Sequence, residues 1–174
     1  MQQSSIKMKK GFTLIELLLY LSVSAIIITI VSIFLATLNE IKIKNQVIST
    51  VEEQGMYISD VINATVRVAK KTVTPNASGA TSLVLELEMI DATKSPTKIY
   101  VTDGILYMKE GAKEALAITD SRIALSELKF YNVTPSGATG HIWYSFKVKA
   151  QSQSNRYQYE YEKVFESGAS VRYN

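Results

Sequence analysis

The side chains that most often carry out catalysis are sparse in this sequence. It contains no cysteine and one histidine, His141, which excludes a thiolate nucleophile, a zinc–thiolate site and a multi-histidine metal centre. No motif places a base beside a serine, and Glu86 and Glu88 share one face of an alternating segment, where such pairs usually face water. We therefore expect a protein that is not an enzyme, with no cofactor and no metal site.

A second group of residues could bind a ligand through stacking and charge. Tyr157, Tyr159 and Tyr161 alternate, so they would project from one face of a strand. The aromatic and basic residues near them in this part of the sequence are Trp143, Tyr144, Lys147, Lys149 and Arg156. Such a surface could stack on single-stranded DNA or contact a sugar or a protein. A ladder of tyrosines that only stabilises the sheet is the interpretation that we favour.

The distribution of charge argues against general binding to nucleic acid. The formal net charge is +3, and three of the 19 Lys and Arg residues (Lys7, Lys9 and Lys10) lie in residues 1–11. The remaining 16 basic residues balance the 16 Asp and Glu residues. A nucleic-acid-binding domain usually keeps a basic excess in its body, so nucleic acid is a partner that the composition does not favour.

The segment from Phe12 to Leu38 is apolar and contains one charged residue, Glu16. Its 27 residues exceed the roughly 20 helical residues that span a bilayer, whereas a secretory signal peptide has only about 7–15 apolar residues. Three lysines precede the segment, and Lys42 and Lys44 follow it closely. We therefore expect a single transmembrane helix with its N-terminus in the cytoplasm and the body of the chain outside.

The residues around Glu16 form a longer pattern. An acidic residue in the middle of a transmembrane helix costs about 2.5–3.5 kcal/mol and less near its end, so Glu16 calls for an explanation. Residues 7–20 read KMKKGFTLIELLLY: a basic leader, then glycine and phenylalanine, then an apolar helix with glutamate at the fifth position after the glycine. This segment resembles the class III signal of type IV pilins and pseudopilins.

The resemblance implies a pathway of processing and assembly. A prepilin peptidase would cut between Gly11 and Phe12 and methylate the new amine of Phe12, and Glu16 would pair with the terminal amine of a neighbouring subunit. The implied partners are other pilin or pseudopilin subunits through the N-terminal helix, prepilin peptidase, an inner-membrane assembly platform and membrane lipid. The implied location is the bacterial cytoplasmic (inner) membrane as a single-pass protein, and an extracellular filament after assembly.

The rest of the chain predicts an α+β fold. Apolar residues continue at helical spacing beyond Leu38, so we expect an amphipathic helix half over residues 39–72, followed by a β-sheet domain over 73–174. The resemblance implies that residues 1–11 are a basic leader that is cleaved, that residues 12–38 form a transmembrane and filament-core helix, and that the sheet domain is extracytoplasmic. Strands are expected at residues 83–90, 98–102, 105–109, 115–119, 127–133, 141–150 and 156–165. Together they predict the pilin lollipop: a long N-terminal helix with an antiparallel sheet packed on its second half.

The predicted function is that of a structural minor subunit, a minor pilin or pseudopilin that helps to initiate or cap a type IV pilus-like filament. Many major pilins of the family that this sequence resembles have a proline in the transmembrane half of the helix. The absence of proline between Phe12 and Lys71 therefore favours a minor subunit over a major one. The order of elements is similar to J-type pseudopilins of type II secretion and W-type minor pilins, and competence (DNA-uptake) pilins fit nearly as well. The alternatives are an adhesin or DNA-binding subunit at the filament tip and an uncleaved signal-anchor membrane protein.

Overall fold

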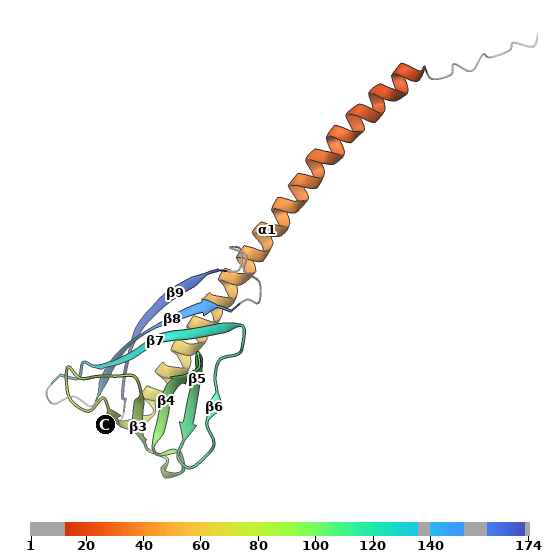
Figure 1. Cartoon of the computed structure of the whole chain (residues 1–174). Coiled ribbons are helices and arrows are strands. Elements are labelled where there is room, and N and C mark those ends of the chain that lie inside the picture. Colours follow the sequence, from red (N-terminus) through yellow and green to blue (C-terminus); the bar gives the residue numbers. More distant parts are fainter. Residues whose placement is uncertain (1–12, 136–139, 152–159, 173–174) are drawn as a thin grey trace, which may run out of the picture. The chain divides into compact units, whose positions relative to one another are not determined.

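The computed structural model describes residues 13–135, 140–151 and 160–172. Within these residues the chain forms one long helix, α1 (Leu14–Arg67), followed by strands in two antiparallel sheets (Figure 1). It divides into two compact units, residues 1–42 and residues 43–174, and each unit is described by itself. The predicted α+β class, with a long N-terminal helix before antiparallel sheet, is confirmed.

The helix ends five residues earlier than the sequence predicted. Residues 39–72 were expected to be helical to the end, but α1 stops at Arg67 and strand β1 (Ala69–Thr74) begins almost at once. Residues 68–74 contain four β-branched side chains, which fit a strand better than a helix. The pairing of β1 with strand β3 (Leu85–Met89) then fixes them as strand.

The first sheet has the order β1-β3-β4-β5-β6. Strands β4 (Thr97–Thr102) and β5 (Ile105–Glu110) form the predicted hairpin, with Thr102 opposite Ile105 and positive φ angles of 52° at Asp103 and 77° at Gly104. Two positive φ angles are what a tight hairpin turn requires. A short 3-10 helix, η1 (Ala92–Lys94), joins β3 to β4, and the edge strand β6 (Leu116–Ala117) has two residues.

The second sheet has the order β2-β7-β8-β9. Its strands are β2 (Thr81–Ser82), β7 (Ile123–Asn132), β8 (His141–Ala150) and β9 (Glu162–Ser170). The predicted antiparallel strands thus form two sheets. The sequence did not specify this division, because alternation of apolar residues defines the faces of a strand and not which strands lie beside it. The strand expected at 156–165 begins in the structure at Glu162 and continues to Ser170, and residues 152–159 lie outside the described part of the chain.

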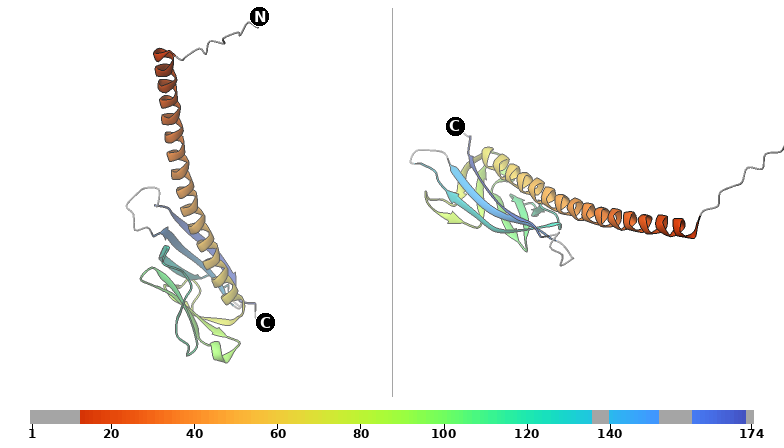
Figure 2. Two further views of the ribbon diagram at one scale, coloured as in Figure 1. Left: turned by 90° about the vertical axis from the view of Figure 1, so that its right-hand side faces the viewer. Right: turned by 90° about the horizontal axis from the view of Figure 1, so that it is seen from above.

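The core of the second unit lies between the sheets and the C-terminal half of α1. Val51, Gly55, Ile58, Ile62 and Val66 are the buried residues of the helix, and their spacing of three or four confirms the predicted amphipathic face. Strands β8 and β9 lie beside this half of the helix in both views (Figure 2). The largest fully buried side chains opposite the helix are Tyr144, Phe130 and Phe146. Burial of each contributes about 1.5–3 kcal/mol.

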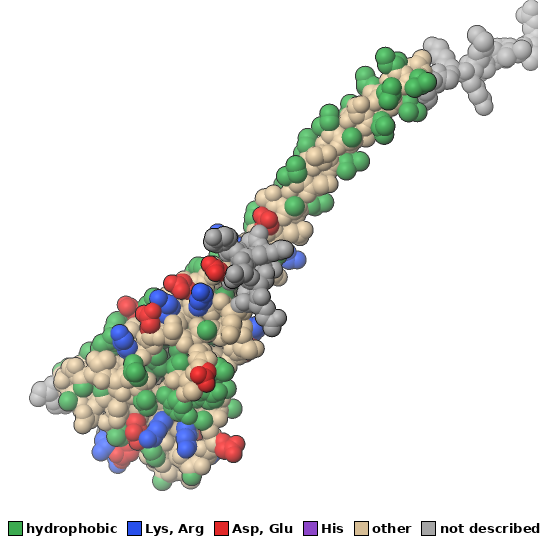
Figure 3. Space-filling model, viewed as in Figure 1, with side chains coloured by type: hydrophobic (Ala, Val, Ile, Leu, Met, Phe, Trp, Pro, Cys, Tyr) green, Lys and Arg blue, Asp and Glu red, His purple; other side chains and the backbone are tan. Residues whose placement is uncertain are grey.

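The two units differ in surface chemistry. Hydrophobic side chains line the N-terminal part of the helix, whereas acidic and basic side chains are interspersed over the strand-bearing unit (Figure 3). Many of those charges form ion pairs, as between Lys98 and Glu86 at 3.3 Å and between Arg122 and Asp120. The mixed surface agrees with the balanced charge of the body and leaves the apolar helix as the feature that needs a partner.

Candidate functional site

The N-terminal end of α1 contains a helix-capping arrangement around Glu16. Thr13 precedes the first helical residue, and its hydroxyl accepts a hydrogen bond from the backbone N–H of Glu16 at 3.4 Å. Thr13 and Glu16 have the T-x-x-E spacing of a capping box, in which the first residue caps the third helical residue. The same glutamate lies in the positive first turn of the helix dipole. This cap fixes where the helix begins and thus where Glu16 lies.

The following segment of the helix exposes an apolar surface on every side. Its large hydrophobic residues between Leu14 and Leu38 are between 44% and 79% exposed. This helix is long and apolar enough to cross a membrane. A soluble protein rarely exposes an apolar surface of this extent, so the segment must be covered by lipid or by other helices.

Four hydroxyl side chains in this segment are satisfied within the helix. The hydroxyls of Ser22, Thr29, Ser32 and Thr37 each donate to the carbonyl four residues earlier, at 2.8–3.1 Å. Such bonds satisfy a hydroxyl where water is absent. Among the described residues of this segment, the carboxylate of Glu16 is the one ionisable side chain apart from Tyr20. The segment is therefore suited to an apolar environment except at its first turn.

The sequence comparison addresses this same region. Residues 6–37 match the family model described as the prokaryotic N-terminal methylation motif. The match covers the leader, the Gly-Phe pair and the exposed apolar helix. The chain carries the N-terminal motif of type IV pilin-like proteins. No curated protein and no solved structure matches it.

The residues predicted to be processed precede the described helix in the sequence. Gly11, Phe12 and the leader lysines fall within residues 1–12, outside the described part of the chain. Glu16 is exposed on the first turn of α1, two residues after the helix begins. The T-x-x-E spacing that begins at Thr13 is present in the sequence and is the signal that predicts this cap.

The predicted aromatic and basic surface is divided by the pleat of β8. Tyr144 is fully buried, whereas Trp143, the neighbouring residue, is half-buried on the opposite face and packs against Tyr131 at 5.0 Å between ring centroids. Tyr144 therefore cannot belong to a ligand-binding surface with Trp143, because successive side chains in a strand point to opposite faces. Residues 156, 157 and 159 lie outside the described residues.

The remaining members of this group are engaged within the protein. Lys147 pairs with Glu127 at 2.8 Å, and this contact raises the pKa of Lys147. Tyr161 is half-buried, packs against the core, and its hydroxyl lies 3.5 Å from Glu52. Only Lys149 is largely exposed, opposite Glu162. The described residues thus provide one Trp and two lysines on this face, which is a weak basis for nucleic-acid binding.

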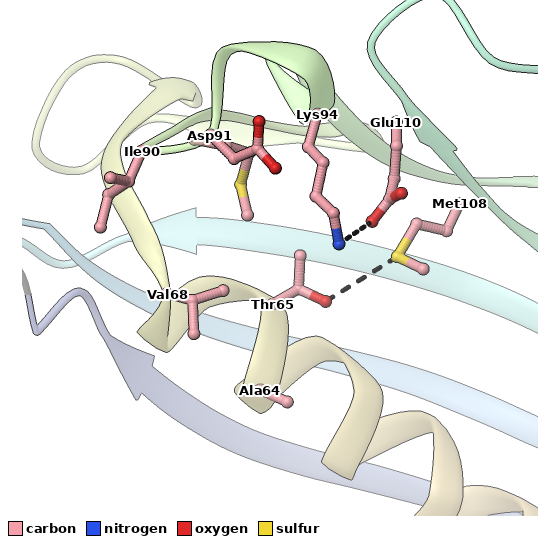
Figure 4. A pocket seen from close by; sticks show the side chains of 9 residues that line it. Ala64, Thr65, Val68, Ile90, Asp91, Lys94, Met108 and Glu110 are labelled. Carbon is pink, nitrogen blue, oxygen red and sulfur yellow. Dashed lines mark hydrogen bonds and ion pairs between the residues drawn. The ribbon is translucent and has the colours of Figure 1, made fainter.

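A cavity of about 570 Å³ lies beside the C-terminal end of α1 (Figure 4). Its wall is mainly apolar, and a 3.3 Å ion pair joins Lys94 and Glu110 at one side. The lining residues are Ala64, Thr65, Val68, Met89, Ile90, Asp91, Lys94, Met108 and Glu110. Asp91 accepts bonds from the hydroxyl and backbone N–H of Thr93, which lower its pKa. This cavity could hold an apolar group, and its polar side chains are engaged: the hydroxyl of Thr65 donates to the carbonyl of Val61, Lys94 pairs with Glu110, and Asp91 accepts from Thr93.

No other cluster of the described residues is arranged for catalysis or metal binding. The Nδ1 atom of His141 lies 2.8 Å from the hydroxyl of Ser170, across the β8–β9 pair, on an exposed edge. Glu88 bonds Lys70 at 2.7 Å and pairs with Lys71 at 3.0 Å; the two contacts lower the pKa of Glu88. The described residues contain no group of three His, Cys, Asp or Glu side chains that could hold a metal ion.

Proposed function

We propose that this chain is a structural minor subunit, a minor pilin or pseudopilin, of a type IV pilus-like filament. The observation that carries this proposal is the methylation motif over residues 6–37, which continues into a helix whose apolar side chains are exposed. The system that it serves would be a pilus, a type II secretion system or a DNA-uptake system, with a role in initiating or capping the filament.

The proposed sequence of events begins in the cytoplasmic membrane. The leader lysines keep the N-terminus in the cytoplasm while the apolar helix spans the bilayer. Prepilin peptidase cuts after Gly11 and methylates the amine of Phe12, and the assembly platform then moves the helix into the filament. Lipid is exchanged for the apolar surfaces of neighbouring helices, so little apolar area is exposed to water at any step.

In this proposal, Glu16 determines the axial offset between neighbouring helices in the filament. A carboxylate in an apolar helix bundle is costly unless it meets an opposite charge. The terminal amine of a neighbouring Phe12 supplies that charge only when the two helices are correctly staggered. The bond from Glu16 N–H to Thr13 supports this role, because it fixes the first turn that carries the carboxylate.

The first experiment is intact-mass analysis of the full chain expressed with and without a prepilin peptidase. We expect a mature chain that begins at methylated Phe12 only when the peptidase is present, and no cleavage of Gly11→Ala. An intact Met1 leader in the presence of a peptidase that cuts a control pilin would refute the proposal and favour an uncleaved signal-anchor protein.

Variants at Glu16 separate processing from assembly. Glu16→Gln keeps the shape of the side chain and removes its charge, so we expect normal cleavage and loss of the subunit from filaments. Glu16→Asp keeps the charge and should retain part of the incorporation. Equal incorporation of Glu16→Gln and the wild type would show that the carboxylate does not set the register.

A further inference from the structure

The four edges of the two sheets are not equally protected against pairing with another strand. Edge strands β2 and β6 have two residues each. Edge strand β1 contains two register irregularities and carries Lys70 and Lys71. Short length, bulges and lysines are the usual means by which proteins block strand addition. Edge strand β9 has nine residues and pairs with β8 without a register shift, so it lacks the first two of these protections.

The backbone groups on the outer side of β9 can be assigned from the bonds at its two ends. The N–H of Ala150 bonds the carbonyl of Tyr161 at 2.9 Å, and the N–H of Val171 bonds the carbonyl of Gly140 at 3.0 Å. Residues 161 and 171 therefore face β8, and alternate residues of an antiparallel strand face opposite sides. The N–H and C=O groups of Glu162, Val164 and Glu166 consequently point away from β8.

Among the described residues, no strand lies beside these outer groups. Among the residues that the structure describes, β8 is the one hydrogen-bonded neighbour of β9 in the sheet. The end of α1 reaches this side only beyond the strand, where the N–H of Arg172 bonds the carbonyl of Arg67 at 3.4 Å. In Figure 1, β9 is the outermost strand of its sheet. The row of donors and acceptors along β9 is therefore a template for one more strand.

Charge on the outer face of the sheet indicates the chemistry of that strand. The Nζ atom of Lys147 in β8 lies 2.8 Å from Glu127 in β7 and 3.8 Å from Glu162 in β9. The sign thus alternates from strand to strand, and a basic residue would continue the series beyond Glu162. Glu166 is exposed and has no ion pair among the described residues, and Val164 between them is 52% exposed.

The same charges disfavour a second copy of this chain as the added strand. Pairing all nine residues of two antiparallel β9 strands would place Glu166 opposite Glu166. A shift that centres the pair on Val164 would place Glu162 opposite Glu166. Like charges in directly opposed positions destabilise a strand pair.

We propose that the free edge of β9 binds an extended segment of a different protein, in which Lys or Arg flanks an apolar residue at alternate positions. Backbone hydrogen bonds to Glu162, Val164 and Glu166 supply the attachment, and the two carboxylates select the basic residues. The side chain of Lys163 lies on the inner face of β9 and pairs with Glu52 at 2.8 Å, so it takes no part in this binding. The proposal does not depend on processing at Gly11 or on assembly into a filament.

The test uses the full-length chain in detergent and the blocked peptide TKTVTKT, with TETVTET as its matched acidic control. We expect the basic peptide to slow hydrogen exchange of the amides of Glu162, Val164 and Glu166, measured by NMR. The acidic peptide should bind at least about tenfold more weakly, because both cross-strand charge pairs become repulsive.

Two variants at Val164 test the backbone contribution. Val164→Pro removes a donor from the free side without removing a bond to β8, and it should abolish peptide binding. Val164→Ala retains the donor and should bind within about threefold of the wild type, since only a few apolar atoms are lost. If Val164→Pro fails to fold, the Glu162→Lys, Glu166→Lys double variant replaces it and should prefer the acidic peptide.

Three results would overturn the proposal. The first is equal protection of β9 by both peptides, and the second is equal binding by Val164→Pro and Val164→Ala. The third is protection of the β9 amides without peptide that grows with protein concentration, which would assign the edge to a second copy of this chain.

Discussion

Gly55 is the residue on which the packing of β9 against α1 depends most directly. A Cβ atom built at Gly55 would lie 2.1 Å from the ring of Phe165, and that ring stacks on Phe146 with 5.4 Å between centroids. Glycine in a helix costs about 1 kcal/mol relative to alanine. Glycine occupies this position despite the cost because any larger side chain would overlap the ring of Phe165.

A double-mutant cycle tests this packing at Gly55. We expect Gly55→Ala to destabilise the wild type by about 1–3 kcal/mol, because the ring must leave its place. In a Phe165→Ala background the same substitution should stabilise the helix by up to about 1 kcal/mol. The measurement is denaturant unfolding followed by the fluorescence of Trp143, the single tryptophan. An effect of the same sign in both backgrounds would refute the contact.

Tyr144 connects the buried face of β8 to α1 through its hydroxyl. The oxygen lies 3.1 Å from the carbonyl of Ser59 and 3.0 Å from Oδ1 of Asn63. Burial raises the pKa of Tyr144 above its ordinary value of 10.0. Because the folded state then holds the proton more tightly than the unfolded chain, this contribution to stability is complete below pH 10.0 and decreases as the pH rises towards the folded pKa.

We therefore expect a pH-dependent effect of Tyr144→Phe. At neutral pH the variant should unfold with a free energy lower by about 1–2 kcal/mol, since a buried hydrogen bond is lost. Above pH 10.0 the difference from the wild type should shrink. Tyr57→Phe, at a residue that is 50% exposed, is the control and should change little. A difference for Tyr144→Phe that is constant with pH would contradict the assignment.

At the scale of the element, the apolar half of α1 has a face of small side chains. At 100° per residue, this face comprises Ser22, Ala25, Thr29, Ser32 and Ala36. Small residues allow the backbones of neighbouring helices to approach in an apolar environment. If the chain assembles as proposed, this is the face on which another helix would pack most closely.

A leucine placed on this face should interfere with assembly. We expect Thr29→Leu to reduce incorporation into filaments at least about tenfold, because helices that pack through small residues lose their close approach. Ser24→Leu adds a similar volume at a position about 140° from Thr29 around the helix and should have little effect. Equal loss in both variants, quantified by immunoblotting of sheared filaments, would show that the whole circumference matters.

The strands of the second unit also differ in how accurately the local sequence predicted them. The β4–β5 hairpin was predicted because Asp103-Gly104 is a turn signal between two alternating segments. The end of α1 was misplaced because β1 is fixed by pairing with β3, a contact that helical spacing does not report. The local turn signal thus predicted the β4–β5 hairpin well, whereas the pairing of distant strands was predicted poorly.

At the scale of the whole molecule, the buried core lies within one unit. All its residues fall between Val51 and Val171. We therefore expect the fragment of residues 43–174 to be soluble and to unfold cooperatively without the apolar segment. Its free energy of unfolding should lie within about 1 kcal/mol of the value for the same unit in the full chain. The reason is that the removed residues contribute no side chain to the buried core. A fragment without cooperative unfolding would contradict this division.

The sequence by itself determined the features of this protein that depend on contiguous residues. The leader, the Gly11-Phe12 pair, the apolar span and Glu16 lie in one segment of 38 residues, and the match over residues 6–37 supports that interpretation. Signals of this kind lie in contiguous residues, so they do not depend on which distant residues the fold brings together. Composition and spacing were therefore sufficient to predict the anchor and its motif.

Only the tertiary structure decided which side chains in the body share a surface. Trp143 and Tyr144 are neighbours in sequence and lie on opposite faces of β8, and Phe165 fills the space left by a glycine 110 residues earlier. The free edge of β9 exists because no strand lies beyond it among the described residues. Pairing and packing between distant residues set these features, and a pattern of neighbouring residues does not contain that information.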